Sequence, residues 1–280
     1  MSHGGGDCTV RVTVPVADAD LAADRLWQAG ASAIVERTVP GGVVLDAGGD
    51  PEALLAAVAD RWPGEAIVVD LAAALDAWRP YARAVTVGDR LVVRPPWVPP
   101  AAVEPGAVEV VVDPGRAFGS GAHPSTRLAL AALVGLVRGG ERVLDVGCGS
   151  GVLALAALAL GAAEAMGVDI DPAAREASAA NAARNGMGDR LAVTDTIARA
   201  AGPAGGRYPL VVANLLLRDM VTLAPEIAAA VHEQGALVVS GVLEGQRAEL
   251  EQAFTGASVV AAASEDGWLA LTLALTLRAP

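Results

Sequence analysis

The sequence predicts an α/β protein with two domains, a small α+β domain followed by a larger domain on a doubly wound, mostly parallel sheet. From residue 106 onward, short apolar runs alternate with helical segments and end in two closely spaced strands. Before residue 72, the segments follow the order β-α-β-β-α-β. The chain has 280 residues and is 53% hydrophobic, which is enough apolar material for two cores.

The first domain is expected over residues 1–71. Alternating valines predict a strand over Cys8–Val14, and Asp18 and Asp20 can cap the helix that follows. Pro40-Gly41-Gly42 is typical of a hairpin, and Pro51 suits the first position of a second helix. The resulting order is that of a ferredoxin-like domain. Because the segment contains no catalytic constellation, we expect it to serve recognition or packing.

Residues 72–105 are expected to be a linker because prolines interrupt them, with one short hairpin across Gly88-Asp89. The larger domain is expected over residues 106–280. Its first strand leads into a long, glycine-rich polar loop, residues 113–126, which has the profile of a binding loop. His123 lies near the end of this loop without a visible partner acid or nucleophile. We therefore interpret it as a structural or capping residue rather than a base.

The larger domain is organised around residues 142–160, which read as a buried strand, a glycine-rich turn and an alanine-rich and leucine-rich helix. Glycines let the backbone approach a ligand closely, and the helix directs free N–H groups toward the turn. A second strand ends in Asp169, 22 residues after Gly147. A βαβ unit places a carboxylate there to bind a ribose diol. The pattern predicts a site for a ligand that contains a nucleoside, whereas its alternative is an ordinary glycine-rich turn.

The turn reads Gly147-x-Gly149-x-Gly151 and is preceded by Asp145, unlike the dinucleotide pattern G-x-G-x-x-G. A carboxylate at that position would repel a pyrophosphate but suits an ammonium group. S-adenosylmethionine has an ammonium group and a ribose and carries no phosphate. We therefore expect S-adenosylmethionine as the cofactor, and we expect no metal.

Charge and composition exclude several classes of function. The formal net charge is −12 and the chain contains no lysine. An acidic surface disfavours a phosphate backbone and attracts a basic partner, although it also simply keeps a protein in solution. Cys8 and Cys148 are not expected to pair, which fits a reducing compartment. We see neither a signal peptide nor a transmembrane segment, and we expect a soluble, cytoplasmic protein.

Several longer motifs resemble those of one family. The loop reads DPGRAFGSGAHPST, the turn VLDVGCGSG, the second strand continues as GVDIDP, and SGVLEGQ begins at Ser240. Asn214-Leu215-Leu216 follows the fourth strand, where enzymes that methylate planar nitrogens usually carry N/D-P-P-Y/F. These motifs resemble the PrmA family, the class I methyltransferases of ribosomal protein L11. The resemblance is strong over about residues 108–254 and weaker before them.

The resemblance implies a seven-stranded, Rossmann-like methyltransferase sheet that ends in a hairpin, preceded by a recognition domain. It assigns cofactor contacts to Phe118, Thr126, Gly147, Gly149, Asp169 and Asn214. Asn214 would also position the acceptor, and Asp195 is a further candidate, for the adenine amino group. The implied substrate is a basic protein, ribosomal protein L11, methylated on lysine or N-terminal amines. Direct nucleic-acid or membrane binding is not expected, and a monomer is favoured.

Two other readings remain open at the level of the sequence. The first is a related class I methyltransferase that acts on lysines of another protein or on a small-molecule amine. The second is a binding module that keeps the fold without the chemistry. The intact set of Asp145, Gly147, Asp169 and Asn214 argues against the second reading.

Overall fold

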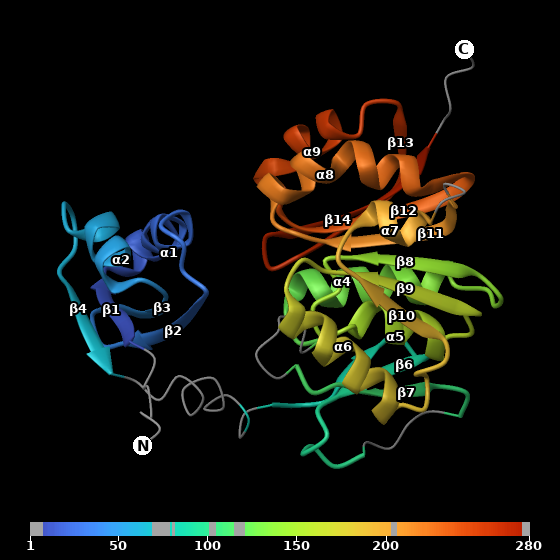
Figure 1. Ribbon diagram of the computed structural model, residues 1–280, viewed down its shortest axis with the longest axis horizontal. Coiled ribbons are helices and arrows are strands. Elements are labelled where there is room, and N and C mark those ends of the chain that lie inside the picture. The colour runs from blue at the N-terminus through green and yellow to red at the C-terminus, as the bar shows by residue number, and fades with distance from the viewer. Residues whose placement is uncertain are drawn as a thin grey trace. The chain divides into compact units, whose positions relative to one another are not determined.

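The structure is a computed structural model that describes residues 8–68, 79, 82–100, 105–114, 121–202 and 206–275. The chain divides into two compact units, Met1–Tyr81 and Ala82–Pro280 (Figure 1). Each unit has a hydrophobic core of its own.

The first unit contains one four-stranded sheet in the order β2-β3-β1-β4 and two helices. Every neighbouring pair of strands in it is antiparallel. Alternate valines of the first strand and the apolar residues of both helices form the core. The elements are β1 (Cys8–Val14), η1 (Val16–Asp18), α1 (Ala19–Gln28), β2 (Ala33–Val39), β3 (Gly42–Gly48), α2 (Pro51–Val58) and β4 (Gly64–Val68).

The expected capping of α1 by Asp18 is wrong in its detail. Asp18 occupies the N-cap position, but its side chain makes no capping hydrogen bond. Its carboxylate instead accepts from Arg61 Nη2 at 2.9 Å and from Trp62 Nε1 at 3.2 Å. A charged and an aromatic donor from the end of α2 therefore replace the backbone N–H groups that local sequence favoured.

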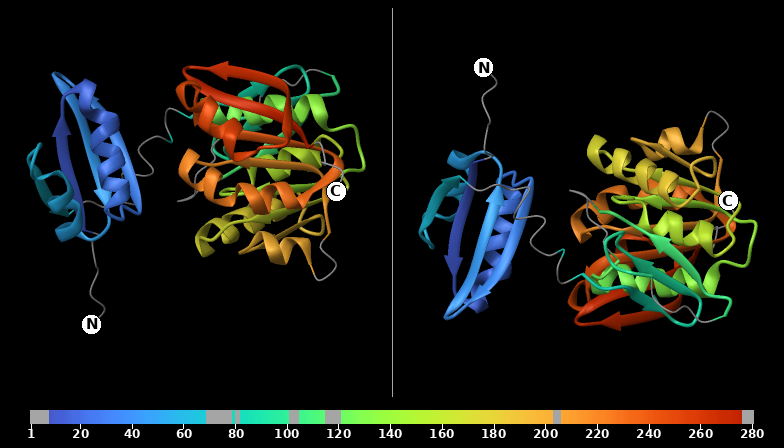
Figure 2. Two further views of the ribbon diagram at one scale, coloured as in Figure 1. Left: turned by 90° about the horizontal axis from the view of Figure 1, so that it is seen from above. Right: turned by 90° about the horizontal axis from the view of Figure 1, so that it is seen from below.

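The second unit is built on a seven-stranded mixed sheet in the order β10-β9-β8-β11-β12-β14-β13. The first five strands of this order run parallel, and β14 is antiparallel to both of its neighbours. The predicted α/β class with a central mixed sheet is confirmed, including the hairpin at one edge, drawn in red in Figure 2. The strands are β8 (Arg142–Val146), β9 (Glu164–Val168), β10 (Leu191–Thr194), β11 (Tyr208–Asn214), β12 (Val231–Leu243), β13 (Ala257–Glu265) and β14 (Trp268–Leu275).

Helices cover both faces of this sheet (Figure 1). The first three helices of this unit pack into one apolar core and the last three into the other, so the sheet lies between two layers of helices. One face carries α4 (Pro124–Leu136), α5 (Val152–Ala159) and α6 (Pro172–Arg184). The other carries α7 (Ile197–Ala201), α8 (Leu217–Ala230) and α9 (Arg247–Ala253), with η3 (Glu244–Gln246) before α9.

Part of the expected linker belongs to the second unit. Strands β5 (Val85–Val87), β6 (Leu91–Arg94) and β7 (Val108–Val111) form a three-stranded sheet, in which β6 pairs with β7 in parallel. Its inward valines and leucines join the core beneath α4 and α5. The prolines of this segment interrupt it without separating it from the core. The short helix that the sequence suggested over residues 72–77 lies outside the described residues.

One helix boundary and one short helix differ from the prediction. The sequence favours a helix over residues 219–232, but α8 ends at Ala230 because Val231 already begins β12 and pairs with Tyr208. Helix α7 was not predicted, since five residues are too few to show a helical period. Thr196 caps it by accepting from Arg199 N at 3.3 Å.

Candidate functional site

The carboxyl ends of four adjacent strands meet at the point where the strand order reverses, between β8 and β11. Val146, Val168, Thr194 and Ala213 lie in one register row across these strands. The residues that follow this row are Gly147, Asp169, Asp195 and Asn214. The sheet therefore lines up four residues that the sequence singled out separately, at the position where open α/β sheets bind ligands.

The turn after β8 needs its glycines. Gly147, Gly149 and Gly151 have φ values of 72°, 53° and 81°, a region that other residues rarely adopt. A Cβ atom on Gly147 would lie 2.3 Å from Leu215 Cδ2, so the close approach of Leu215 also requires glycine. Gly147 and Gly149 are partly exposed, whereas Cys148 and Ser150, which alternate with the glycines, are buried. The turn thus presents bare backbone outward and anchors itself with the side chains between.

Asp169 is held in place by backbone N–H groups. Its Oδ2 accepts from Gly149 N at 2.9 Å and its Oδ1 accepts from Asp171 N at 3.0 Å. A carboxylate offers about four lone-pair directions, so both oxygens keep accepting capacity. Gly149 was expected to contact the cofactor, yet its N–H is used to orient Asp169. The side chain is partly exposed and fixed in direction, as an acceptor for a diol must be.

Asp145 is fully buried behind the turn. Its Oδ2 accepts from Ala154 N at 3.1 Å, in the first turn of α5, whose N-cap Gly151 has no side chain to cap it. Its Oδ1 has no hydrogen-bond partner within the described ranges. Burial, with a smaller contribution from the charge of Asp169, raises the pKa of Asp145 to about 7. An unpaired buried carboxylate oxygen is costly, so a cationic group beside it would be stabilised.

Thr126 and Asn214 are brought together across 88 residues of sequence. Asn214 Nδ2 donates to Thr126 Oγ1 at 3.2 Å. Thr126 is buried in the first turn of α4, and Asn214 is half-buried at the end of β11. The neighbouring Ser125 is held by Ser240, whose hydroxyl donates to Ser125 O at 3.0 Å. The beginning of α4 is therefore fixed against the ends of β11 and β12.

His123 caps α4, which confirms the structural reading. Its Nδ1 accepts from Ser125 N at 3.3 Å and lies 2.8 Å from Ser125 Oγ. Its ring packs edge-on against Trp268, with centroids 4.6 Å apart. Burial, assisted by the charge of Arg127, lowers the pKa of His123, which favours the neutral ring that can accept at Nδ1. One turn later, Arg127 forms a salt bridge with Glu265 at 2.7 Å, which ties the helix to the β13–β14 hairpin.

Asp195 and Phe118 are the remaining residues that the sequence predicted for the site. Asp195 Oδ2 accepts from Arg199 at 2.7 Å, and its Oδ1 is buried without a partner among the described residues. Phe118 lies outside the described residues. Ile170, which directly follows Asp169 and has 87% of its surface exposed, was not predicted as a site residue. Leu216, from the Asn214-Leu215-Leu216 motif, is 58% exposed. Large apolar side chains so exposed beside polar ones are typical of a binding surface.

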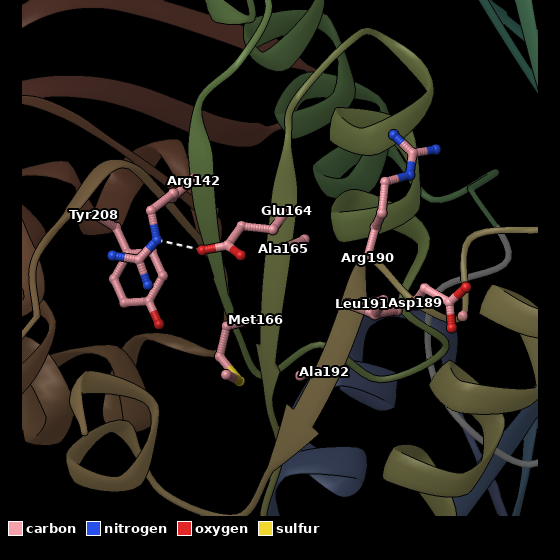
Figure 3. Close-up of a pocket in the computed structure, with 10 residues that line it drawn as sticks. Arg142, Glu164, Ala165, Met166, Asp189, Arg190, Leu191, Ala192 and Tyr208 are labelled. Carbon is pink, nitrogen blue, oxygen red and sulfur yellow. Dashed lines mark hydrogen bonds and ion pairs between the residues drawn. The ribbon is translucent and has the colours of Figure 1, made fainter. Parts of the chain in front are cut away.

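A pocket of about 320 Å³ lies at the amino ends of the same four strands (Figure 3). Arg142, Glu164, Leu191 and Tyr208 line it, and each is the first residue of its strand. Arg142 forms an ion pair with Glu164, and its guanidinium carbon lies 4.9 Å from the centroid of the Tyr208 ring. The charges of Arg142 and Glu164 neutralise each other. The row of residues at the carboxyl ends, Gly147, Asp169, Asp195 and Asn214, does not line this pocket.

Across the part of the chain that the structure describes, no helix is long and apolar enough to cross a membrane. Over the same residues, His, Cys, Asp and Glu side chains form no group of three or more that could hold a metal ion.

The doubly wound sheet, its antiparallel hairpin and the residue row at the switch point define a Rossmann-like methyltransferase fold. Residues 69–276 match the family described as ribosomal protein L11 methyltransferase (PrmA), and the chain belongs to this family. The crystal structure of a ribosomal protein L11 methylase from Lactobacillus delbrueckii subsp. bulgaricus superposes with a TM-score of 0.63. It is 29% identical and covers 70% of this chain and 100% of that one.

Curated relatives agree with this assignment. A ribosomal protein L11 methyltransferase of Ectopseudomonas mendocina is 46% identical over 198 residues, which cover 70% of this chain and 66% of the relative. One of Symbiobacterium thermophilum is 41% identical and covers 70% and 63%. One of Chromohalobacter salexigens is 41% identical over 238 residues, or 80% and 77%. The chain thus spans slightly less than two thirds of the length of the first two relatives.

Proposed function

We propose that this protein is an S-adenosylmethionine-dependent methyltransferase whose substrate is ribosomal protein L11. Family membership supports the activity and the substrate, because the relatives carry that name. The row Gly147, Asp169, Asp195 and Asn214 at the switch point is the observation that carries the proposal. It combines a bare glycine turn with acceptors for a ribose and an adenine.

The residues present suit this cofactor. Asp169 would hold the ribose hydroxyls, Asp195 the adenine amino group, and Thr126 with Asn214 the methionyl end. Asp145 Oδ1, which has no hydrogen-bond partner among the described residues, suits an ammonium group, and Gly147 leaves a partly exposed backbone without a Cβ beside the close-packed Leu215. Phe118 and Gly149 complete the proposed set, with Gly149 acting through its bond to Asp169. When bound, S-adenosylmethionine supplies a methyl group already activated by a sulfonium.

The acceptor is an amine, either a lysine ε-amine or an N-terminal α-amine. Asn214, Leu215 and Leu216 offer one amide and two aliphatic side chains, and no ring on which a planar nitrogen could stack. A lysine amine has a solution pKa near 10.4 and must lose a proton before it reacts. Desolvation between leucines lowers that pKa, and orientation by Asn214 supplies much of the acceleration. The mechanism assigns no general base.

The partner is a basic protein. A chain of net charge −12 attracts basic segments and repels nucleic-acid phosphates. We propose that it acts as a monomer, without direct nucleic-acid or membrane contact. Because ribosomal proteins are made in the cytoplasm, the proposed substrate places the enzyme there.

The N-terminal segment, residues 1–71, is proposed to be a ferredoxin-like recognition domain, followed by a connecting segment, residues 72–105, whose strands β5 and β6 join the core of the catalytic domain proposed over residues 106–280. The observed strand order β2-β3-β1-β4 with two helices supports the fold. A truncated chain that begins at Ala72 keeps β5 and β6, which pack into the second core. It should bind the cofactor with unchanged affinity and fail to methylate intact L11. Full activity of this chain would refute the division of labour.

The activity is tested by incubating the protein with purified ribosomal protein L11 and S-adenosylmethionine labelled in its methyl group. Label is expected on L11. Because the enzyme contains no lysine, methyl-lysine in the hydrolysate cannot arise from the enzyme itself. Label that appears on another protein or a small amine in a lysate, with L11 unlabelled, would favour the alternative of a related methyltransferase with a different acceptor.

A further inference from the structure

Helix α6 carries a stripe of polar residues on the face that it packs against the rest of the unit. Ser178, Asn181 and Asn185 are spaced three and four residues apart, so they lie on one side of the helix. Ser178 and Asn181 are fully buried. Buried polar side chains in a helix require partners, and these three find theirs on the backbone of other segments.

Two members of the stripe bind the carbonyl groups of the glycine turn. Ser178 Oγ donates to Gly149 O at 2.9 Å, and Asn181 Nδ2 donates to Ser150 O at 3.0 Å. Gly151 is pressed against the same helix, since a Cβ there would lie 2.9 Å from Ser178 Oγ. Two successive peptide groups of the turn are therefore fixed by α6.

The stripe also binds the edge of β7. Asn181 Oδ1 accepts from Asp113 N at 3.0 Å, and its Nδ2 donates to Asp113 O at 2.8 Å. One helical turn later, Asn185 makes the same pair of bonds with Val111, at 2.8 and 2.7 Å. The two amides bind alternate residues as a neighbouring strand would, opposite the edge that pairs with β6. Asn181 alone joins the two segments, because Asn185 does not reach the turn.

The contacts to the turn have a consequence for the site. In a trans peptide the C=O and N–H groups point in opposite directions, so holding a carbonyl toward α6 directs the N–H of the same peptide away from it. Asn181 holds Ser150 O and so fixes the peptide plane that carries the Gly151 N–H, which donates to Cys148 O at 2.8 Å. Cys148 O shares its peptide plane with the Gly149 N–H, which donates to Asp169 Oδ2 at 2.9 Å. Ser178 fixes the adjoining peptide, between Gly149 and Ser150. Loosening these linked peptide groups would let their planes rotate and would release Asp169.

We infer that Ser178 and Asn181 are positioning residues for the cofactor, which fix the peptide planes of the glycine turn from behind. The inference rests on the proposed function, in that it concerns the same cofactor. Neither side chain needs to touch S-adenosylmethionine, since each acts through the carbonyl that it binds.

The test compares Asn181→Ala with Asn185→Ala by calorimetric titration with S-adenosylmethionine. Each variant loses a paired amide contact, Asn185→Ala with Val111 in β7 and Asn181→Ala with Asp113 just after it, and only Asn181→Ala also loses the bond to Ser150. Asn181→Ala should raise the Kd about tenfold, and Asn185→Ala less than twofold. Ser178→Ala, which removes a single hydroxyl and should fold normally, is expected to raise the Kd about threefold to tenfold. Equal Kd values for the two asparagine variants would overturn the inference.

Amide hydrogen exchange in the free protein decides the matter without the cofactor. The Gly149 and Gly151 amides should exchange faster in Asn181→Ala and Ser178→Ala than in Asn185→Ala. The variants are compared under conditions in which all three have the same free energy of unfolding. Unchanged exchange in the first two would contradict the inference even if the unaltered chain binds S-adenosylmethionine. Failure of the unaltered chain to bind would refute the proposed function, while exchange would still report on α6.

Discussion

The two ends of strands β8 to β11 carry different kinds of polar group. At the amino ends, Arg142 and Glu164 are 47% and 56% exposed and pair with each other beside Tyr208. At the carboxyl ends, Asp145 is buried and one of its oxygens has no partner among the described residues, and Asp169 accepts from the backbone N–H groups of Gly149 and Asp171. Arg142 and Glu164 thus find their partners within the protein, whereas the oxygens of Asp145 and Asp169 can still accept hydrogen bonds from a ligand.

The two ends differ in which polar groups already have partners. The pocket of about 320 Å³ at the amino ends is lined by Arg142 and Glu164, which pair with each other. Parallel strands direct their carboxyl ends toward the helix N-termini, and that is where N–H groups and spare acceptors gather.

The largest expected effect comes from two acids that flank the same strand. Asp169→Ala should weaken S-adenosylmethionine binding by about 1.5–3 kcal/mol, because a ribose would lose its charged acceptor. Glu164→Ala, five residues earlier at the start of β9, should leave the affinity unchanged, because Glu164 lies at the opposite end of the strand from the candidate site, and its exposed ion pair contributes less than about 1 kcal/mol to stability. Calorimetric titration of both variants is the measurement. An unchanged affinity for the Asp169 variant would remove the ribose assignment.

The buried Asp145 predicts a dependence of stability on pH. Its pKa is about 7 in the folded protein and about 3.9 when unfolded, so between these values only the folded state keeps the proton. Stability should therefore fall as pH rises from about 4 to 7 and then level off. In Asp145→Asn this loss should shrink by more than about 1.4 kcal/mol, the equivalent of one pKa unit. Denaturant unfolding at pH 5 and pH 8 measures it.

The same carboxyl group links cofactor binding to protons. If the ammonium group of S-adenosylmethionine binds at Asp145, binding should release a proton below about pH 7 and weaken as pH falls. Calorimetry in buffers of different ionisation enthalpy counts that proton. The Asp145→Asn variant should release none, and equal proton release by both proteins would exclude Asp145 as the source.

The smallest effect concerns the bond between Asn214 and Thr126. A double-mutant cycle with Asn214→Ala and Thr126→Val should give a coupling of about 1 kcal/mol in unfolding free energy, because the bond is part-buried. The corresponding cycle on Arg142 and Glu164 should give less, since that pair is exposed. A larger coupling at the amino end would reverse the comparison between the two ends.

Much of the fold followed from local pattern. The glycine turn, the strand that ends at Asp169 and the Asp266-Gly267 hairpin each have a short signature, and the structure has them where expected. The ends of elements that are set by tertiary contacts could not be predicted from local pattern. Val231 leaves its helix to pair with Tyr208, and β5 and β6 leave the expected linker to join a core.

The residues of the candidate site could be named from the sequence one by one, but their arrangement could not. Asp169 stands out because it ends a strand and Asn214 through the resemblance to a family, yet only the strand order puts them in one row. The contacts of Asn181 with Ser150 and Asp113 span 31 and 68 residues and have no local signature. Ile170 escaped notice because an isoleucine after a strand reads as core until its exposure is known.

The central claim is that the protein methylates an amine of ribosomal protein L11 at the site formed by Gly147, Asp169, Asp195 and Asn214. Mass spectrometry of L11 after incubation with the enzyme and S-adenosylmethionine, read residue by residue, tests it most directly. The account predicts methyl groups on lysine ε-nitrogens or on the α-amine, absent when Asp169→Ala replaces the unaltered enzyme at limiting cofactor. Methyl groups on glutamine or on carboxylates, or an L11 that stays unmodified, would contradict it.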